Sequence, residues 1–321
     1  MKEDVAIVIV TYNAERQIRP CLNSLRDESL LSNTFIVDNL SADGTVSVIR
    51  NEYSGVHLVQ LSRNVGFGKG NNVGISRALQ CGYSCVFLLN QDAMVFPGCL
   101  DSLCSAATLN PGYGVLSPLH YGAESGILES DFRCFVRSSK LFDDALAFSV
   151  KDVYPVSFVN AAAWLITEEC LSMVGGFSPN FFLYGEDIDY CNRLEFYGLR
   201  VGVVPGSKIK HLREGNPLSY ASPFSFRNRS RRSEQEFMWH LINPSEKIWR
   251  AAYALLVDIG AALMWGVVSH TLRIAVADLC AWFRCLRRIP ELKAIRGKNI
   301  SKSKYLWLLD NAVTAETSDF A

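Results

Sequence analysis

The feature that most constrains the fold is the apolar run VAIVIV at Val5–Val10. The run is continuous and rich in β-branched residues, which is typical of a strand buried on both faces. Such strands belong to parallel sheets, whose two faces are covered by helices. Short apolar runs recur further along the chain, and segments with helical periodicity lie between them. This alternation predicts a doubly wound α/β fold with a mostly parallel, Rossmann-like central sheet flanked by helices.

Polar clusters follow the carboxyl ends of four expected strands, at residues 5–10, 35–37, 56–61 and 85–89. Ligands of open α/β sheets bind at this edge, where the strand order reverses. The same residue types also populate ordinary turns, but the repetition at four strand ends favours a binding site. The candidate residues are Thr11, Tyr12, Asn13, Asp38, Asn64, Gly66, Gly68, Asn71, Asn90, Gln91 and Asp92.

The residue types in these clusters indicate a nucleotide and a metal ion. Asp92 follows a buried strand, and Mg²⁺ or Mn²⁺ commonly takes one or two carboxylates together with substrate phosphates. Asp38 is placed to accept N–H donors from a pyrimidine base. The glycines at 66, 68 and 70 let the backbone approach a ligand closely. They do not form GxGxxG and no P-loop occurs, so neither a dinucleotide site nor ATP hydrolysis is predicted.

The segment Phe181–Leu194, FFLYGEDIDYCNRL, places three carboxylates at the start of an expected helix. They are Glu186, Asp187 and Asp189, and an apolar tetrad and a glycine precede them. The macrodipole and free N–H groups stabilise acidic groups at a helix N-terminus, so a helix cap is one interpretation. The polar strand ends favour a second interpretation, in which one of these carboxylates is catalytic.

The character of the chain changes beyond about residue 233, so we expect domains at 1–232 and 233–321. Residues 251–269 contain a single charge, Asp258, over a length close to that of a membrane span. Basic residues follow this apolar part, and a hydrophobic helix pair with a cationic rim suits an anionic membrane surface. The alternatives are a helical hairpin packed on the main domain or across a homo-oligomer, and a membrane-spanning helix.

Charge and cysteine content restrict the partners and the compartment. Lys plus Arg and Asp plus Glu both total 32, so no global field favours nucleic acid as a partner. The ten cysteines are scattered, without a CxxC pair, which indicates a reducing cytoplasm. The first apolar run is too short and wrongly flanked for a signal peptide.

An ordered set of motifs covers residues 5 to about 232. The motifs are VAIVIVTYNAERQIRPCLNSL, FIVDNLSADGT, LSRNVGFGKGNNVGI, VFLLNQDA and GGFSPNFFLYGEDIDYCNRL. Together they resemble an inverting family 2 glycosyltransferase of the GT-A fold, most similar to the bacterial rhamnosyltransferase-like branch. The resemblance implies a GT-A catalytic domain with a C-terminal helical extension.

The resemblance also implies roles for the strand-end residues. Thr11 and Asp38 would hold the nucleobase and ribose, with Asn64 and the glycine loop near the nucleotide. Asp92 falls at the last carboxylate of the DxD motif, the direct metal ligand. His211, in IKHLREG, matches the late histidine that completes the metal or diphosphate site.

Some positions depart from the DxD pattern or complete the nucleotide-sugar site. Asn90 replaces the first carboxylate, as in the LNPD form of the branch, and Gln91 replaces the proline of that form. These replacements disfavour tight binding of Mg²⁺ or Mn²⁺, but the site itself is retained. We also assign Trp164, Glu186 and Arg227 to the nucleotide-sugar site.

Asp187 takes the position of the catalytic base in the ED motif of the family. An acceptor hydroxyl must lose its proton as it attacks the anomeric carbon, and a positioned carboxylate is the simplest general base. A single displacement inverts the configuration, so no enzyme nucleophile is needed. The helix start would hold Asp187 ionised beneath the sugar, while Glu186 and Asp189 support the loop.

The predicted function is transfer of a sugar, L-rhamnose from dTDP-L-rhamnose, to a lipid-linked or surface-polysaccharide acceptor. UDP-galactofuranose or another UDP-hexose remains an alternative donor, because the donor rests on branch resemblance only. A non-catalytic sugar-nucleotide or glycan-binding module is a further alternative, disfavoured by the set Asp92, Asp187 and His211. We expect a cytoplasmic protein, peripheral on the inner leaflet of the membrane.

Overall fold

The computed structural model describes residues 4–123, 126–212, 226–247, 253, 256–257, 260–261, 264, 272–301 and 303–308. Most of the apolar stretch 251–269, including Asp258, therefore lies outside the described residues. The chain divides into two compact units. The first contains residues 1–214 and 304–321, and the second contains residues 215–303. The division differs from the expected boundary after residue 232, which falls inside helix α9 (Phe226–Ile242).

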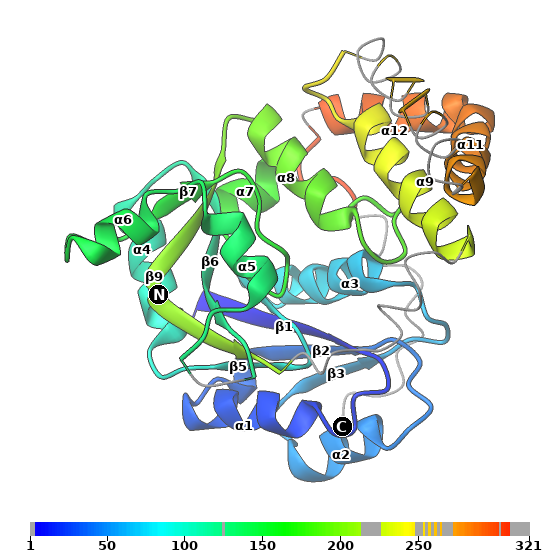
Figure 1. Ribbon diagram of the computed structural model, residues 1–321. Helices are drawn as coiled ribbons and strands as arrows, with labels where there is room; N and C mark the ends of the chain where they lie inside the picture. Colours follow the sequence, from blue (N-terminus) through cyan, green and yellow to red (C-terminus); the bar gives the residue numbers. More distant parts are fainter. Residues whose placement is uncertain are drawn as a thin grey trace. The chain divides into compact units, whose positions relative to one another are not determined.

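The first unit is built on one sheet, whose strand order is β3-β2-β1-β4-β8-β6-β9-β5, with β7 paired to β9 (Figure 1). Strands β1 to β4 are parallel, as the alternating pattern predicts. Strand β8 runs antiparallel to β4 and β6, and β5 and β7 run antiparallel to β9. The sheet is therefore mixed, with strands β1 to β4 as its parallel part. The strands are β1 Val5–Thr11, β2 Thr34–Asp38, β3 His57–Gln60, β4 Cys85–Leu89, β5 Ala93–Val95, β6 Tyr113–Tyr121, β7 Tyr154–Val156, β8 Ala163–Ile166 and β9 Arg200–His211.

Helices cover both faces of the sheet in the first unit. Helices α1 and α2 lie on one side of β1 to β3 and α3 lies on the other (Figure 1). Helix α4 shares the apolar core of α1 and α2, while α5, α7 and α8 share that of α3. The bounds are α1 Ile18–Asp27, α2 Thr45–Glu52, α3 Phe67–Gln80, α4 Cys99–Leu109, α5 Ser130–Val136, α6 Leu141–Leu146, α7 Glu168–Met173 and α8 Glu186–Phe196, with a short 3-10 turn at Leu31–Asn33.

The apolar run of β1 explains this layering. Alternate side chains of a strand point to opposite faces. Ile7 and Ile9 belong to the core on the α1 side, whereas Ala6 and Val8 belong to the core on the α3 side. All four are fully buried, so the strand carries no polar alternation.

The second unit contains α9, α11 (Leu272–Arg287) and α12 (Ile289–Ile300). Small side chains on α11, Ala277 and Ala281 among them, are fully buried, which lets α9 approach closely. The Arg229 guanidinium donates two hydrogen bonds to the buried Asp278 carboxylate, at 2.8 and 2.9 Å. None of the described helices combines the length and the apolar content needed to cross a bilayer.

The last described residues return to the first unit, although the sequence predicts that they belong to the extension. The Ser76 hydroxyl donates to the Leu308 carbonyl oxygen at 2.9 Å, and the Gly176 N–H donates to that of Leu306 at 2.8 Å. Leu308 is 1% exposed. The second unit is therefore inserted in the chain of the first unit rather than following it.

The ten cysteines are all free, as their scattered positions in the sequence predict. Six are buried, and burial raises the pKa of the Cys21 thiol. These side chains therefore behave as small apolar groups of the core.

Candidate active site

A buried hydrogen bond joins the ends of β1 and β2. The Thr11 hydroxyl donates to Asp38 Oδ1 at 3.2 Å, and the backbone N–H of Ser41 donates to Oδ2 at 3.0 Å. Thr11 is fully buried and Asp38 is 2% exposed. The structure thus brings together the two residues predicted to hold the nucleobase and ribose. Each carboxylate oxygen of Asp38 keeps a further lone pair for a ligand.

The loop after β1 exposes the ring of Tyr12 to solvent, and the side chains of Asn13 and Ser41 hold the loop in place. Tyr12 is 48% exposed, which leaves its face available for stacking. Asn13 has a φ of 50°, a left-handed conformation that asparagine tolerates. Its Oδ1 accepts the N–H of Ala42 at 2.8 Å, and its own N–H donates to the Ser41 hydroxyl at 2.9 Å. Asn13 therefore joins the loops after β1 and β2.

Two asparagines hold the glycine loop that opens α3. The Asn64 Oδ1 accepts the N–H of Gly66 at 3.0 Å. Asn39 is 3% exposed; its Oδ1 accepts the N–H of Val65 at 2.8 Å, and its Nδ2 donates to the Gly66 carbonyl at 3.2 Å. The loop is therefore anchored to the end of β2, where Asp38 lies.

The glycines of this loop serve close contacts within the protein, whereas the sequence predicts that they admit a ligand. A Cβ on Gly66, whose φ is 88°, would lie 2.1 Å from the Phe182 carbonyl oxygen. A Cβ on Gly68 would lie 3.0 Å from the Cβ of Phe177. Asn71 is 1% exposed and donates to the Phe67 carbonyl of its own helix. The polar spacing alone could not distinguish these packing roles from ligand contacts.

The loop after β4 is tied to the loop after β1 by the amide of Gln91. Its Oε1 accepts the N–H of Tyr12 at 2.8 Å, and its Nε2 lies 3.5 Å from the Tyr12 carbonyl oxygen. This contact accounts for a glutamine where the related motif has proline. The adjacent Asn90 N–H donates to the Ala162 carbonyl at 2.8 Å, which links the loop to the turn before β8.

Asp92 and His211 form the centre of the predicted metal site. His211 Nε2 lies 3.3 Å from Asp92 Oδ1 and 3.5 Å from the Asn90 side-chain amide. His211 is 3% exposed and lies at the end of β9, where it pairs with Ala93 of β5. Burial disfavours the charged imidazole, but hydrogen bonds with Asp92 and Glu129 outweigh it and raise the pKa of His211 to about 9.

These two side chains fit a hexacoordinate divalent cation. Neighbouring ligands at Mg²⁺ or Mn²⁺ distances are separated by roughly 3 Å, close to the observed 3.3 Å between Oδ1 and Nε2. Over the part of the chain that the structure describes, no group of three or more His, Cys, Asp or Glu side chains has metal-binding geometry. A cation held by Asp92 and His211 would thus take its other ligands from the diphosphate and water, as Mg²⁺ commonly does.

Helix α8 begins with two carboxylates in a poorly solvated position. Gly185, with a φ of 94°, precedes the helix, and Glu186 is 4% exposed. Burial raises the pKa of Glu186 to about 8, and the neighbouring Asp187 charge adds to this effect. Burial also raises the pKa of Asp187 to about 6, against an opposing hydrogen bond from the Ile188 N–H at 2.9 Å. A carboxylate with such a pKa is a competent general base near neutral pH.

The third carboxylate of this helix start has a structural contact. Asp189 accepts a hydrogen bond from Arg193 Nε at 2.9 Å, and both side chains are fully buried. The other guanidinium nitrogens of Arg193 donate to the Val174 and Gly176 carbonyl oxygens at 2.7 and 2.8 Å. Arg193 therefore fastens α8 to the loop that precedes the FFLYGED segment.

The turn at residues 161–162, just before β8, connects the two carboxylate sites. Its Ala162 carbonyl accepts the N–H of Asn90 at 2.8 Å. Hydrogen bonding from the Ala161 backbone lowers the pKa of Asp187 and so partly offsets burial. Asp187 and the loop that carries Asp92 therefore border the same turn.

Trp164 does not contribute to this site. Trp164 is fully buried in β8 and stacks on Phe177, with ring centroids 6.1 Å apart. It has no exposed surface for a nucleotide sugar, so we leave it out of the proposed site. Arg227 is an exposed residue of α9, in the second unit, and its assignment stays a prediction.

Sequence reasoning missed two residues of this region, Asn39 and Glu129. Asn39 follows Asp38 directly, so its position in a polar strand end was a usable signal. Glu129 Oε2 lies 3.1 Å from His211 Nδ1, although the two residues are far apart in the chain. No local pattern marks Glu129, because only the pairing of β6 with β9 brings the two segments together.

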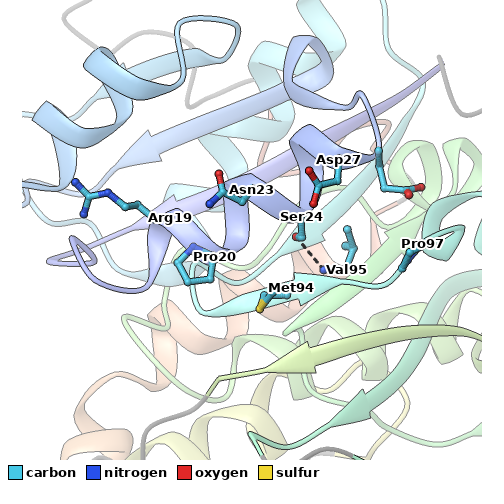
Figure 2. A pocket seen from close by; sticks show the side chains of 9 residues that line it. Arg19, Pro20, Asn23, Ser24, Asp27, Met94, Val95 and Pro97 are labelled. Atoms are coloured by element: carbon cyan, nitrogen blue, oxygen red, sulfur yellow. Dashed lines mark hydrogen bonds between the residues drawn. The ribbon is translucent and has the colours of Figure 1, made fainter.

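A surface pocket of about 430 Å³ lies elsewhere, between α1 and β5 (Figure 2). Figure 2 shows the Ser24 hydroxyl bonded to the Val95 N–H, at 3.1 Å, across its floor. Its lining contains none of the predicted site residues. Arg19 at its rim is paired with Glu52 at 2.7 Å. Because the pocket shares no residue with the predicted site, we do not assign it to that site.

Comparisons with known proteins identify a matching family and two relatives of this chain. Residues 6–132 match the model of the family described as glycosyl transferase family 2. An N-acetylglucosaminyl-diphospho-decaprenol L-rhamnosyltransferase of Mycobacterium tuberculosis is 25% identical over 242 residues, covering 66% of this chain and 76% of that protein. The dTDP-rhamnosyl transferase RfbF of Shigella flexneri is 23% identical over 212 residues, covering 66% of this chain and 70% of that protein.

A solved structure shares the fold over nearly the whole chain. It is the mannosyltransferase PcManGT of Pyrobaculum calidifontis in complex with GDP-Man and Mn²⁺. The TM-score is 0.53 at 18% identity, and the match covers 97% of this chain and 86% of that one. At this identity the likeness concerns the fold alone.

Proposed function

We propose that this family 2 glycosyltransferase of the GT-A fold transfers L-rhamnose from dTDP-L-rhamnose to a hydroxyl of a lipid-linked or surface-polysaccharide acceptor. The observation that carries this proposal is the pair of carboxylate sites flanking residues 161–162, one with Asp92 and one with Asp187. The reaction needs two such sites. One binds the charged leaving group of the donor, and the other takes the proton that the acceptor hydroxyl loses. The names of two relatives support rhamnose as the transferred sugar.

Asp187 is the proposed general base. Its carboxylate takes the proton of the acceptor hydroxyl as the oxygen attacks the anomeric carbon. The bond from that carbon to the nucleoside diphosphate breaks on the opposite face, so the configuration inverts. The raised pKa of Asp187 favours this role, since a base is most effective when its pKa lies near the working pH.

Asp92 and His211 are the proposed metal ligands. A bound Mg²⁺ or Mn²⁺ would neutralise the negative charge that develops on the departing diphosphate. The mannosyltransferase that shares the fold is described with Mn²⁺, which supports a divalent cation in general. Asn90 would orient the imidazole or the diphosphate from its place beside Nε2.

Asp38 and Tyr12 are the proposed nucleoside contacts, and the buried Thr11 hydroxyl holds the Asp38 carboxylate in place. The remaining lone pairs of Asp38 accept a pyrimidine N–H, and the exposed Tyr12 ring stacks on the base. Asn13, Asn64, Gly66 and Gly68 hold the surrounding loops in place. The first group is therefore proposed to contact the nucleoside, and the second group only shapes the loops around it.

A donor screen with the full-length protein tests the proposal. Released nucleotide is measured with dTDP-L-rhamnose, UDP-galactofuranose, other UDP-hexoses and GDP-mannose, each with Mg²⁺ or Mn²⁺. Nucleotide release dependent on acceptor and fastest with dTDP-L-rhamnose supports the proposal. Faster release with a UDP-hexose would assign that donor instead. Binding of a donor without turnover, with every acceptor offered, would favour a non-catalytic module.

We also propose that the second unit rests on the cytoplasmic, anionic surface of a membrane. On α11 the exposed residues Arg273, Val276, Phe283 and Arg287 recur at helical spacing and so share one face. Apolar side chains between cationic ones suit the boundary between headgroups and acyl chains. The exposed Tyr253 and Met264 lie in the preceding apolar stretch.

Co-sedimentation with vesicles tests this membrane contact. Phe283→Ser in the full chain should weaken binding to vesicles rich in phosphatidylglycerol. Phe148→Ser is the matched control, since Phe148 is 98% exposed but lies in the first unit. Equal binding of both variants, or equal binding to neutral vesicles, would contradict the proposal, and self-association in gel filtration would favour a homo-oligomer.

A further inference from the structure

We propose that Glu129 is a positioning residue for His211, whose imidazole it orients toward the cation shared with Asp92. The Glu129 carboxylate accepts the N–H at Nδ1, so that Nε2 carries the lone pair. The inference rests on the metal site of the proposed function.

The geometry places the two carboxylates at opposite ends of the imidazole ring. Glu129 Oε2 lies 3.1 Å from Nδ1, and Asp92 Oδ1 lies 3.3 Å from Nε2. A neutral imidazole has one N–H and one lone pair. Both nitrogens face a carboxylate, but a cation shared with Asp92 would occupy Nε2 and leave the proton at Nδ1, where Glu129 accepts it. A carboxylate at Nδ1 therefore selects the tautomer whose Nε2 can bind a metal.

The position of Glu129 is determined by its backbone. It precedes the first turn of α5, its N–H donates to the His120 carbonyl at 2.9 Å, and its own carbonyl accepts the N–H of Arg133 at 2.9 Å. Its side chain is 11% exposed. The carboxylate is thus held against His211 with little freedom to turn toward solvent.

The imidazole of His211 is also held by its neighbours. The fully buried ring of His120 lies edge to face with it, with centroids 6.4 Å apart. The N–H of Leu212 donates to the Asp92 carbonyl at 2.7 Å, which fixes the strand that carries the histidine beside the carboxylate. Both ligands and the proposed positioning residue therefore occupy determined places before a cation binds.

Direct ligation by Glu129 is the competing interpretation. Within the described ranges no group of three such side chains has metal-binding geometry, although Asp92, His211 and Glu129 are neighbours. The ring separates Glu129 from the side on which Asp92 and Nε2 meet. This arrangement favours a role of Glu129 through His211 over direct ligation.

The experiment is a titration of the full-length protein with Mn²⁺ in the presence of dTDP, with free Mn²⁺ read by electron paramagnetic resonance. Glu129→Met, which fills a similar volume without an acceptor, should weaken Mn²⁺ binding by about 10- to 100-fold. Glu129→Gln keeps an acceptor oxygen and should restore most of the affinity. In a His211→Ala background, Glu129→Met should not lower the Mn²⁺ affinity any further. Asp131→Asn, an exposed carboxylate of α5, is the matched control.

The outcomes separate the inference from the proposed metal site. Unchanged Mn²⁺ binding in both His211→Ala and Asp92→Asn would refute the metal site itself. If those variants lose Mn²⁺ while Glu129→Met binds as the parent does, only the inference is overturned. The inference would also be overturned if Glu129→Met lowered the Mn²⁺ affinity further in the His211→Ala background. The same holds if Glu129→Gln lowered that affinity as much as Glu129→Met does.

A measurement on the unsubstituted protein does not depend on the folding of any variant. With Mg²⁺ and dTDP bound, nitrogen-15 spectra of labelled histidine should show His211 protonated at Nδ1. A proton at Nε2 would overturn the inference.

Discussion

The loop after β4 and the start of α8 both carry carboxylates, but their surroundings differ. Asp92 faces a histidine, which a second carboxylate contacts from the other side. Glu186 is buried and the adjacent Asp187 is half-buried, and loss of solvation raises the pKa of both carboxyl groups. The first arrangement favours holding a cation, and the second favours taking up a proton. The same residue type thus acquires two chemistries from its environment.

The largest expected effect tests the role of Asp187 as the general base. Asp187→Asn should lower the transfer rate by about 10²- to 10⁴-fold, because the amide cannot accept the acceptor proton. Binding of dTDP with Mn²⁺ should remain, whereas Asp92→Asn should weaken it. Steady-state rates and titration calorimetry measure the two quantities. Asp27→Asn, exposed on α1, is the control; an unchanged rate in Asp187→Asn would exclude this residue as the base.

The next effect concerns the ion pair that fastens α8. Arg193→Ala should lower the free energy of unfolding by about 3–5 kcal/mol, because it removes the buried cation of this ion pair and its hydrogen bonds to two backbone carbonyls. Urea denaturation measures the change. Arg63→Ala, at an exposed position, should have little effect. A loss of less than about 1 kcal/mol would mean that Asp189 finds another partner or is solvated.

A smaller effect concerns the contact between the glycine loop and the FFLYGED segment. Gly66→Ala and Gly82→Ala both place a side chain at positive φ, 88° and 91°, at a cost of about 1–2 kcal/mol. Only at Gly66 does the added Cβ meet a backbone oxygen, that of Phe182, while at Gly82 the surrounding space is open. Thermal unfolding should therefore show a larger loss for Gly66→Ala. Equal losses would show that the loop moves aside at no cost.

The smallest effect is a change in how stability depends on pH. The pKa of Glu186 is raised by burial from its ordinary 4.5 to about 8 in the folded protein. The folded state therefore binds the proton more tightly than the unfolded state does. This contribution to stability is lost as the pH rises from 4.5 to about 8. Glu186→Gln has no such proton to lose.

Melting temperatures between about pH 5 and pH 9 check this expectation. The advantage of Glu186→Gln over the parent should grow as the pH rises. Glu195→Gln, at an exposed position of the same helix, should follow the parent. Parallel curves for Glu186→Gln and the parent would contradict the raised pKa.

Sequence reasoning described the first half of the sheet well and the second half poorly. The run at β1 and the polar ends after β2 and β4 reflect local periodicity, which the chain carries by itself. The antiparallel direction of β8 depends on which strands it pairs with, and no local pattern records that pairing. For the same reason the burial of Trp164 and the packing role of Gly66 became visible only in the structure.

The sequence by itself determined the alternation of strands and helices, the strand ends that bear polar residues, and the acidic start of α8. These features depend on neighbours in the chain, whose spacing sets which face each side chain occupies. Tertiary structure alone decided that Glu129 contacts His211 and that residues 304–308 return to α3. It also decided which carboxylates of α8 are paired with a cation and which are only buried. Contacts between distant segments set burial and charge, and these determine the chemistry of a carboxylate.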